Sequence, residues 1–261
     1  MKKTSYSAPS VKKAFKVLYA VSDAPDGLGI SDLSKQLRIG KSTIHGITSA
    51  LEELGVLVRD PVHKRYTMGY SLLELCRTTY AKMELKDVAR KPMEHLTRVV
   101  GETVFLGVLN GDHVTILDVV ESSNEMKITS PPGSRLPLLV GATGRVLLAQ
   151  REREKAREIV QRTGLVRYTS KSVIDPRQFL KEVANAKELG YAVDDGEYIS
   201  GIWAVASALR STPLHPSAIW VAGFTSALDD QKIKAAVREI QKTVQEINQS
   251  IGATIRKGLL A

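Results

Sequence analysis

The spacing of apolar residues predicts three helices in the first part of the chain. Apolar side chains recur at three- and four-residue intervals over 11–21, which is typical of one buried helix face. A second, short helix is expected over 32–37, with Ser31 as its N-cap. A tight turn at 38–40 then leads into a third helix, expected over 41–53.

Two helices joined by a short turn that contains glycine form a helix-turn-helix, which leaves the outer face of the second helix free for the major groove of DNA. Hydroxyl groups, an amine and an imidazole on that face are suited to base edges and phosphates. A solvated face without a partner is the alternative. The candidates for DNA contact are Lys41, Ser42, Thr43, His45, Thr48 and Ser49.

A short apolar pattern after the third helix predicts a hairpin. Residues 56–58 and 65–68 are expected to pair as strands around the turn 59–64. Beside a helix-turn-helix such a hairpin is a wing, and cations at its tip reach the phosphate backbone next to the groove. Without the preceding helices it would be only an exposed basic hairpin. The basic candidates are Arg59, His63, Lys64 and Arg65.

Residues 71–85 have apolar side chains on more than one face of an expected helix. Such a helix needs several packing partners, so we interpret it as a linker between two domains and as a dimer contact. Packing on its own domain is the alternative. The expected organisation is a winged helix-turn-helix domain over 1–69, a linker helix over 70–87 and a larger domain over 88–261.

The larger domain begins with a strong hairpin signal, because Asn110-Gly111-Asp112 separates two apolar runs at 102–109 and 113–120. A further strand is expected near 126–129. An apolar helix opens at 141, and the N-terminus of a helix can face an anion. Strands and helices of this kind predict an α+β chain.

Charge is distributed unevenly along the 261 residues, a length that suits two domains of unequal size. The net charge is +9 and the isoelectric point is near 9.5. Residues 1–90 carry 15 Lys and Arg against 9 Asp and Glu, whereas residues 91–261 carry 22 against 19. A basic small domain beside a nearly balanced larger one favours a polyanion as partner.

The sequence predicts a cytoplasmic protein. Its longest apolar stretches, such as 218–224, are far shorter than the roughly 20 residues of a membrane span. The basic N-terminus is not followed by the apolar core of a signal peptide. Cys76 is the single cysteine, so no intrachain disulfide can form, which agrees with a reducing compartment. We expect no association with a membrane.

Three motifs carry a resemblance to a known family. They are Gly-Ser-Arg-Leu-Pro-Leu at 133–138, the pair Gly144-Arg145, and Gly-Tyr-Ala-Val-Asp-Asp-Gly-Glu at 190–197. With the helix-turn-helix, the chain from 30 to about 256 resembles the IclR family of bacterial transcriptional regulators. It departs from the family pattern at Gly46, where the recognition helix commonly has Arg, and at Arg210, where an aromatic residue or His is expected.

The resemblance implies an effector domain similar to GAF and PAS sensors, with a six-stranded antiparallel sheet flanked by helices around a small-molecule pocket. Mostly apolar walls with few polar anchors are typical of ligand pockets. For Trp220 and Ile202, ordinary core packing is the alternative. The matching motifs imply that the pocket is lined by Leu138, Ala142, Thr143, Asp194, Ile202, Ala204, Trp220 and Ala222.

The expected ligand is an organic or aromatic acid. Asp194 in the pocket opposes a carboxylate unless it is protonated, whereas the backbone amides of Ala142 and Thr143 are suited to receive one. The other partner is double-stranded operator DNA. A single helix-turn-helix reads too few base pairs for specificity, so we expect a homodimer or a dimer of dimers.

Three other functions fit parts of the sequence. An enzyme is suggested by the acidic cluster of Asp194, Asp195 and Glu197, but no nucleophile with a paired base and no Walker or dinucleotide-binding loop accompanies it. An architectural DNA binder would leave the larger domain without a task. A metal sensor is disfavoured because the histidines lack ligand spacing. We therefore expect no enzyme, no cofactor and no metal. The histidines are His45, His63, His95, His113 and His215.

Overall fold

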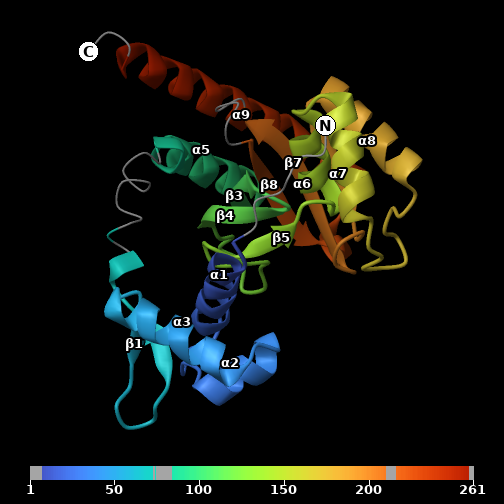
Figure 1. Ribbon diagram of the computed structural model, residues 1–261. Coiled ribbons are helices and arrows are strands. Elements are labelled where there is room, and N and C mark those ends of the chain that lie inside the picture. Colours follow the sequence, from blue (N-terminus) through green and yellow to red (C-terminus); the bar gives the residue numbers. More distant parts are fainter. Residues whose placement is uncertain (1–7, 73, 75–83, 210–215, 259–261) are drawn as a thin grey trace. The chain divides into compact units, whose positions relative to one another are not determined.

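The computed structural model describes the backbone of residues 8–72, 74, 84–209 and 216–258. The chain divides into two compact units, Met1–Lys82 and Met83–Ala261 (Figure 1). In the ranges described, no helix has the length and apolarity that crossing a membrane requires. Most of the expected linker, with Cys76, lies outside the described residues, as do Arg210 and His215. The proposed dimer contact of the linker therefore stays a prediction.

The first unit is a small three-helix domain with a two-stranded sheet. Its helices are α1 (Pro9–Ser22), α2 (Ile30–Leu37) and α3 (Lys41–Glu53), and its antiparallel strands are β1 (Leu57–Arg59) and β2 (Tyr66–Met68). All five elements lie where the apolar pattern predicts them. The expected cap of α2 is wrong, because α2 begins at Ile30 and Gly29 is its N-cap.

The N-terminus of α2 is closed by Asp32 instead of Ser31. The Asp32 carboxylate accepts a hydrogen bond from the backbone N–H of Gly29 at 3.1 Å. A carboxylate three residues after the N-cap can pair with the N-cap amide in this way. Ser31 therefore lies inside the first turn of the helix and makes no cap.

The second unit is built on one antiparallel sheet of six strands. The strands are β3 (Thr103–Asn110), β4 (His113–Val120), β5 (Arg135–Pro137), β6 (Tyr191–Asp195), β7 (Ile202–Leu209) and β8 (Ser217–Phe224). They lie in the order β5-β4-β3-β8-β7-β6, and every neighbouring pair is antiparallel. The β3–β4 hairpin pairs Asn110 with His113, and Gly111 in its turn has a φ of 64°, which a glycine adopts without strain.

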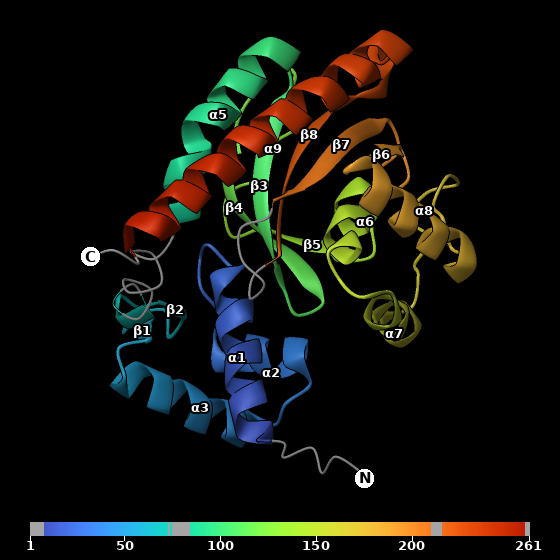
Figure 2. The same ribbon diagram turned by 90° about the horizontal axis from the view of Figure 1, so that it is seen from above.

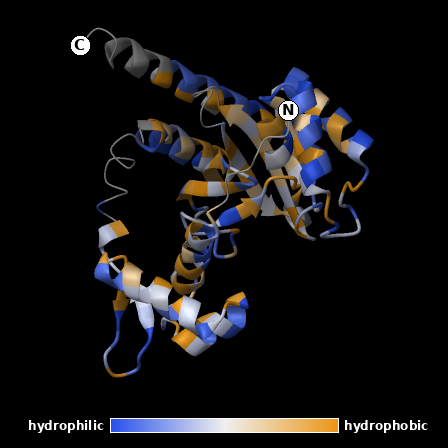
Figure 3. Cartoon of the chain, in the orientation of Figure 1, coloured by the Kyte–Doolittle hydropathy of each residue, from blue (hydrophilic) through white to orange (hydrophobic). Residues whose placement is uncertain are grey.

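Helices cover both faces of this sheet. Figure 2 shows α5 (Glu84–Val100) and α9 (Asp230–Gly258) side by side on one face, and α6 (Gly141–Ala149) and α8 (Pro176–Leu189) on the other, with α7 (Arg153–Thr163) beside α8. Each face has its own buried apolar cluster. Hydrophilic and hydrophobic positions alternate along α5 and α9 (Figure 3), as expected for helices with one buried face.

One expected strand is absent, because residues 126–129 form no strand in the structure. Two side chains hold this segment against its own loop: Lys127 forms an ion pair with Glu121 at 2.8 Å, and the Thr129 hydroxyl donates to Glu121 at 2.6 Å. The edge of the sheet beside β4 is taken by β5. The sixth strand of the expected sheet is therefore β5.

Candidate DNA-binding surface and ligand cavity

The arrangement of α2 and α3 follows from one small core. Leu33 of α2 and Ile44 of α3 are fully buried with Val17, Leu57 and Tyr66. The turn between the two helices requires a left-handed residue, and Arg38 adopts it with a φ of 56°. Because α3 packs by its Ile44 side, the opposite side is left in solvent.

Five of the six candidates on α3 lie on this exposed side. Ser49 Oγ and His45 Nδ1 lie 3.3 Å apart, so these two candidates orient each other. Gly46 lies among them, and a Cβ atom at this position would meet nothing within 4 Å. Packing therefore does not require glycine at the position where the family commonly has Arg. The exposed candidates are Lys41, Ser42, Thr43, His45 and Ser49.

Thr48 is the exception, and its expected place on the exposed face is wrong. Its side chain is fully buried, one helical turn after Ile44. The hydroxyl donates to the carbonyl oxygens of Ile44 at 3.0 Å and His45 at 3.1 Å. A threonine on the buried side of a helix satisfies its hydroxyl in this way, so Thr48 holds α3 in place and does not face a groove.

The turn of the β1–β2 hairpin is organised by Asp60. Its carboxylate accepts hydrogen bonds from the backbone N–H groups of Val62 at 2.7 Å and His63 at 3.2 Å. His63 Nδ1 lies 2.6 Å from Asp60 Oδ2. The hydrogen bond from His63, aided by the backbone donors, lowers the pKa of Asp60 to about 2. Two of the basic candidates, His63 and Lys64, lie in this exposed turn.

The structure separates the roles of the other basic residues of the hairpin. Arg65 donates to the carbonyl oxygen of Gly27 at 3.0 Å, and its guanidinium lies 3.9 Å from the Asp32 carboxylate. The Arg59 guanidinium lies 5.7 Å from the centre of the Tyr66 ring. Arg65 therefore ties the hairpin to the helices, whereas the side chain of Lys64 is exposed beside the turn.

In the second unit, the expected ligand-binding residues gather around one cavity of about 250 Å³. It lies between the sheet and the N-terminus of α6. Seven of the eight candidates line it: Ala142, Thr143, Asp194, Ile202, Ala204, Trp220 and Ala222. Leu138 does not line it, because its side chain is 1% exposed and packs in the core behind α6.

Trp220 forms the aromatic wall of this cavity. Its ring stacks on Phe105 with 5.4 Å between the ring centres and 9° between the planes. Gly107 makes room for it, because a Cβ atom there would lie 2.9 Å from two atoms of the indole ring. The alternation along β7 has the expected result, since Ala204 faces the cavity and Trp203 is buried on the other side of the sheet.

Asp194 is the buried acid of the cavity. Its carboxylate accepts a hydrogen bond from the backbone N–H of Glu197 at 2.7 Å. Burial raises the pKa of Asp194 to about 6, although this hydrogen bond acts in the opposite direction. The same carboxylate lies against Gly141, the first residue of α6, so an acid already faces this helix N-terminus.

Behind Asp194, Arg145 forms a buried charged cluster. Its side chain is 4% exposed and lies 2.6 Å from the Glu182 carboxylate, and it also pairs with Glu197. A third hydrogen bond reaches the carbonyl oxygen of Val193 at 3.1 Å. The guanidinium also lies 5.8 Å from the centre of the Phe179 ring. Arg145 thereby joins α6, α8 and the chain around Asp194.

Several cavity residues were missed by the sequence analysis. Tyr198 and Ile199 come from the turn between β6 and β7, which has no periodic pattern. This turn is held by a distant loop, because Thr169 donates to the carbonyl oxygen of Gly196 and Ser172 to that of Glu197, each at 2.7 Å. Side chains alternate between the two faces along β3 and β4, and this alternation was the available signal for Phe105 and Ile116. The missed lining residues are Phe105, Ile116, Ile128, Thr129, Ser130, Arg135, Leu136, Val140, Gly141, Tyr198 and Ile199.

Acidic side chains do not gather into a metal site in the described part of the chain. No group of three His, Cys, Asp or Glu residues there is placed to hold a metal ion. Of the acidic cluster in the motif at 190–197, Asp195 points outward and pairs with Lys171 at 2.9 Å, while Glu197 pairs with Arg145. The three acids therefore have separate partners.

Comparison with known proteins covers nearly the whole chain. The family model described as "IclR helix-turn-helix domain" matches residues 10–61, and the model "Bacterial transcriptional regulator IclR C-terminal" matches residues 77–249. The HTH-type transcriptional repressor AllR of Escherichia coli K12 is 25% identical over 246 residues, which are 94% of this chain and 91% of AllR.

Solved structures agree in fold. A crystal structure of an IclR transcriptional regulator from Alicyclobacillus acidocaldarius has a TM-score of 0.79 at 23% identity and covers 94% of this chain and 99% of its own. An IclR homologue from Microbacterium hydrocarbonoxydans, solved in complex with 4-hydroxybenzoate, has a TM-score of 0.79 at 22% identity, with the same coverage. The expected α+β fold class is confirmed, and the chain belongs to the IclR family of bacterial transcriptional regulators.

Proposed function

We propose that this chain is a ligand-responsive transcriptional regulator that binds operator DNA through α3 and the β1–β2 wing and senses a small molecule in the cavity beside Asp194. One observation carries the proposal. Seven residues that the family resemblance implies for ligand binding come from four separate elements of the chain and line a single cavity. Relatives across almost the full length are named transcriptional regulators.

The DNA-binding part of the proposal rests on the exposed side of α3. Thr43, His45 and Ser49 are the side chains that would meet base edges in the major groove. Lys41 stands at the start of α3, whose N-cap Gly40 provides no side-chain cap, so its amide groups and the lysine together suit a phosphate. Lys64 on the wing would add a second phosphate contact. Because one helix-turn-helix reads too few base pairs for specificity, we infer a dimer or a dimer of dimers that binds an inverted repeat.

The ligand we infer is a compact organic acid with a hydrogen-bond donor at its other end. The cavity walls are mostly apolar, with Asp194 at one place and Arg135 as the cationic residue among the described lining residues. Because Asp194 already faces the N-terminus of α6, a donor group of the ligand suits that place and its carboxylate suits the side of Arg135. A ring would stack on Trp220. An aromatic hydroxy acid of the kind named for the Microbacterium structure has this chemistry.

The same proposal assigns no catalytic task and no cofactor. The ligand is bound and released unchanged, and its difference in affinity for two states of the protein alters DNA binding. A regulator of this kind works in the compartment that holds the DNA, so we infer that the protein is cytoplasmic.

Gel-shift titration and footprinting with the DNA upstream of its own gene and of neighbouring genes test the DNA-binding part. We expect a protected inverted repeat, and a single asymmetric half-site bound by a monomer would contradict the proposal. For the cavity, thermal-shift assays compare 4-hydroxybenzoate with benzoate and phenol. Stabilisation by the hydroxy acid above both single-function analogues supports the inferred ligand class. Turnover of any of the three would contradict the assignment as a sensor.

A further inference from the structure

A second and larger cavity, of about 600 Å³, lies in the same unit between α7 and α8. It shares no lining residue with the cavity beside Asp194. Side chains from α6, α7 and α8 make its floor apolar. The floor consists of Leu148, Ala149, Ala156, Leu180, Val183 and Ala184.

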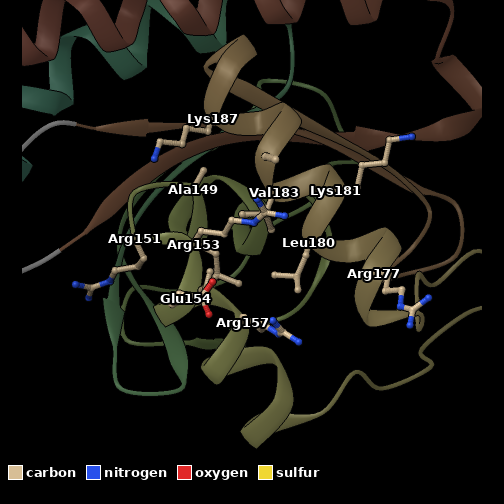
Figure 4. Close-up of a pocket in the computed structure, with 13 residues that line it drawn as sticks. Ala149, Arg151, Arg153, Glu154, Arg157, Arg177, Leu180, Lys181, Val183 and Lys187 are labelled. Carbon is tan, nitrogen blue, oxygen red and sulfur yellow. The ribbon is translucent and has the colours of Figure 1, made fainter.

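Basic side chains surround this floor, and Glu154 is the acidic residue that lines it. Figure 4 shows Arg153 and Arg157 extending from α7 toward Leu180 and Val183 of α8, whereas Arg151 and Lys181 point away from the centre. A cavity lined in this way has a positive potential at its mouth. The basic lining residues are Arg151, Arg153, Arg157, Arg177, Lys181 and Lys187.

The cations of this cavity have no partner among the residues that the structure describes. Within the ranges that the structure describes, none of the six basic side chains forms an ion pair or a hydrogen bond, although other arginines of the unit do. Glu182 on α8 follows Lys181 in the sequence, but it is paired with Arg145 and does not line the cavity. The guanidinium groups of Arg153 and Arg157 are therefore available to an external anion. Their planar donors match phosphate and carboxylate oxygens.

We propose that this cavity binds a small organic phosphate of the nucleotide kind, with its phosphates on Arg153 and Arg157 and its flat apolar part on the floor at Leu180 and Val183. The volume lies within the roughly 300–1,000 Å³ of small-molecule sites. An inorganic anion would leave the floor uncovered. A DNA duplex would meet the outward-pointing Arg151 and Lys181 and not the recessed floor. The site is separate from the proposed DNA and effector sites, so it stands independently of them.

Calorimetric titration of the full chain with ATP tests the proposal. We expect saturable binding of one ATP per chain and weaker binding of inorganic tripolyphosphate and of adenosine, because each leaves part of the site unfilled. The double substitution Arg153→Gln with Arg157→Gln should weaken ATP binding at least about tenfold, because the loss of hydrogen bonds to a charged group lowers affinity by a factor of this order. Leu180→Ala should weaken the binding of ATP and leave the binding of tripolyphosphate unchanged.

The matched control is Lys155→Gln with Arg162→Gln, which removes the same charge from exposed positions of α7 outside the cavity. Circular dichroism verifies that every variant is folded. If both double variants weaken ATP binding equally, general electrostatic attraction explains the binding and the proposal is overturned. Absence of saturable ATP binding would also overturn it, and so would tripolyphosphate binding as tightly as ATP. Protection of α7 and α8 from hydrogen exchange by an acidic peptide but not by ATP would assign the cavity to a protein partner instead.

Discussion

The Asp194 side chain packs so closely against Gly141 that a Cβ atom at Gly141 would lie 2.1 Å from Asp194 Oδ2. Gly141 also has a φ of 48°, which disfavours any other residue. The two residues come from the start of α6 and from β6, which are far apart in the sequence. Their contact fixes the acid at the cavity wall and explains why the helix N-terminus there is not open to a second anion.

The stability of the protein should fall as the pH rises through about 6 because of Asp194. Its pKa is raised by burial from 3.8 to about 6, so folding favours the neutral acid. This contribution is fully present below pH 3.8 and is lost as the pH rises through about 6. Two pKa units correspond to about 3 kcal/mol of unfolding free energy. We expect Asp194→Asn, measured by urea unfolding, to gain stability relative to the wild type by about that amount between pH 4 and pH 8.

Asp195→Asn is the control for this measurement, since it removes a neighbouring acid that lies at the surface beside Lys171. The same pH trend in both variants would contradict the assignment to Asp194. Asparagine keeps an oxygen that can accept from the Glu197 amide, so the variant should fold.

Loss of Arg145 should destabilise the second unit strongly. Arg145→Met leaves the Glu182 and Glu197 carboxylates close together without their shared cation, and breaking a buried ion pair costs about 3–5 kcal/mol. Arg145→Lys keeps the charge and should cost clearly less. Chemical denaturation measures both. If the triple variant Arg145→Met with Glu182→Gln and Glu197→Gln is no more stable than Arg145→Met alone, the ion pairs are not the cause.

The fold of the second unit was largely predictable because local rules agree with the global arrangement. The Asn110-Gly111 turn defined the β3–β4 hairpin, and alternation along β7 separated Trp203 from Ala204. Tyr198 and Ile199 could not be found in this way. Their turn has no periodicity, and hydrogen bonds from a distant loop hold it in place.

The buried position of Thr48 has a local signal in the sequence. Position 48 lies four residues after Ile44, on the buried side of α3, and a β-branched residue there can satisfy its hydroxyl on its own helix. By contrast, the role of Arg65 depends on the Gly27 carbonyl, which only the tertiary fold brings close.

Thr48→Val and Thr43→Val should therefore have different effects on DNA binding. Thr48→Val removes a buried hydroxyl that bonds its own helix, so we expect a change in stability of about 1 kcal/mol and unchanged base preference. Thr43→Val alters the exposed side of α3 and should relax base preference without affecting stability. Binding to operator variants with single base-pair changes measures the preference. Altered preference in Thr48→Val would show that Thr48 reaches the DNA.

The wing offers a comparison between two variants that lose the same charge. Lys64 has a φ of 56°, which strains any residue with a Cβ atom but not glycine. The variant Lys64→Gly should therefore be more stable than Lys64→Ala by about 1 kcal/mol. Both variants should weaken binding to all DNA sequences alike. Both should also reduce the slope of log affinity against log salt concentration by about one.

Arg65→Ala should behave differently from both Lys64 variants, because Arg65 bonds the Gly27 carbonyl and positions the wing. We expect its main effect on the thermal stability of the first unit, with weaker DNA binding as a consequence. A change in salt slope as large as that of Lys64→Ala, with unchanged stability, would instead make Arg65 a direct phosphate contact.

Filling the cavity should separate ligand sensing from DNA binding. Ala204 lines the cavity next to Asp194, its register partner on the neighbouring strand β6, so Ala204→Trp places an indole ring where the ligand would lie. Ligand control of DNA binding typically corresponds to about 1–3 kcal/mol, or roughly 5- to 150-fold in affinity. We expect the folded variant to lose this response while its operator affinity without ligand stays close to the wild type. Gel-shift titration with and without the acid that stabilises the wild type measures both quantities. A folded variant that still responds to the acid as the wild type does would place the sensing site outside this cavity.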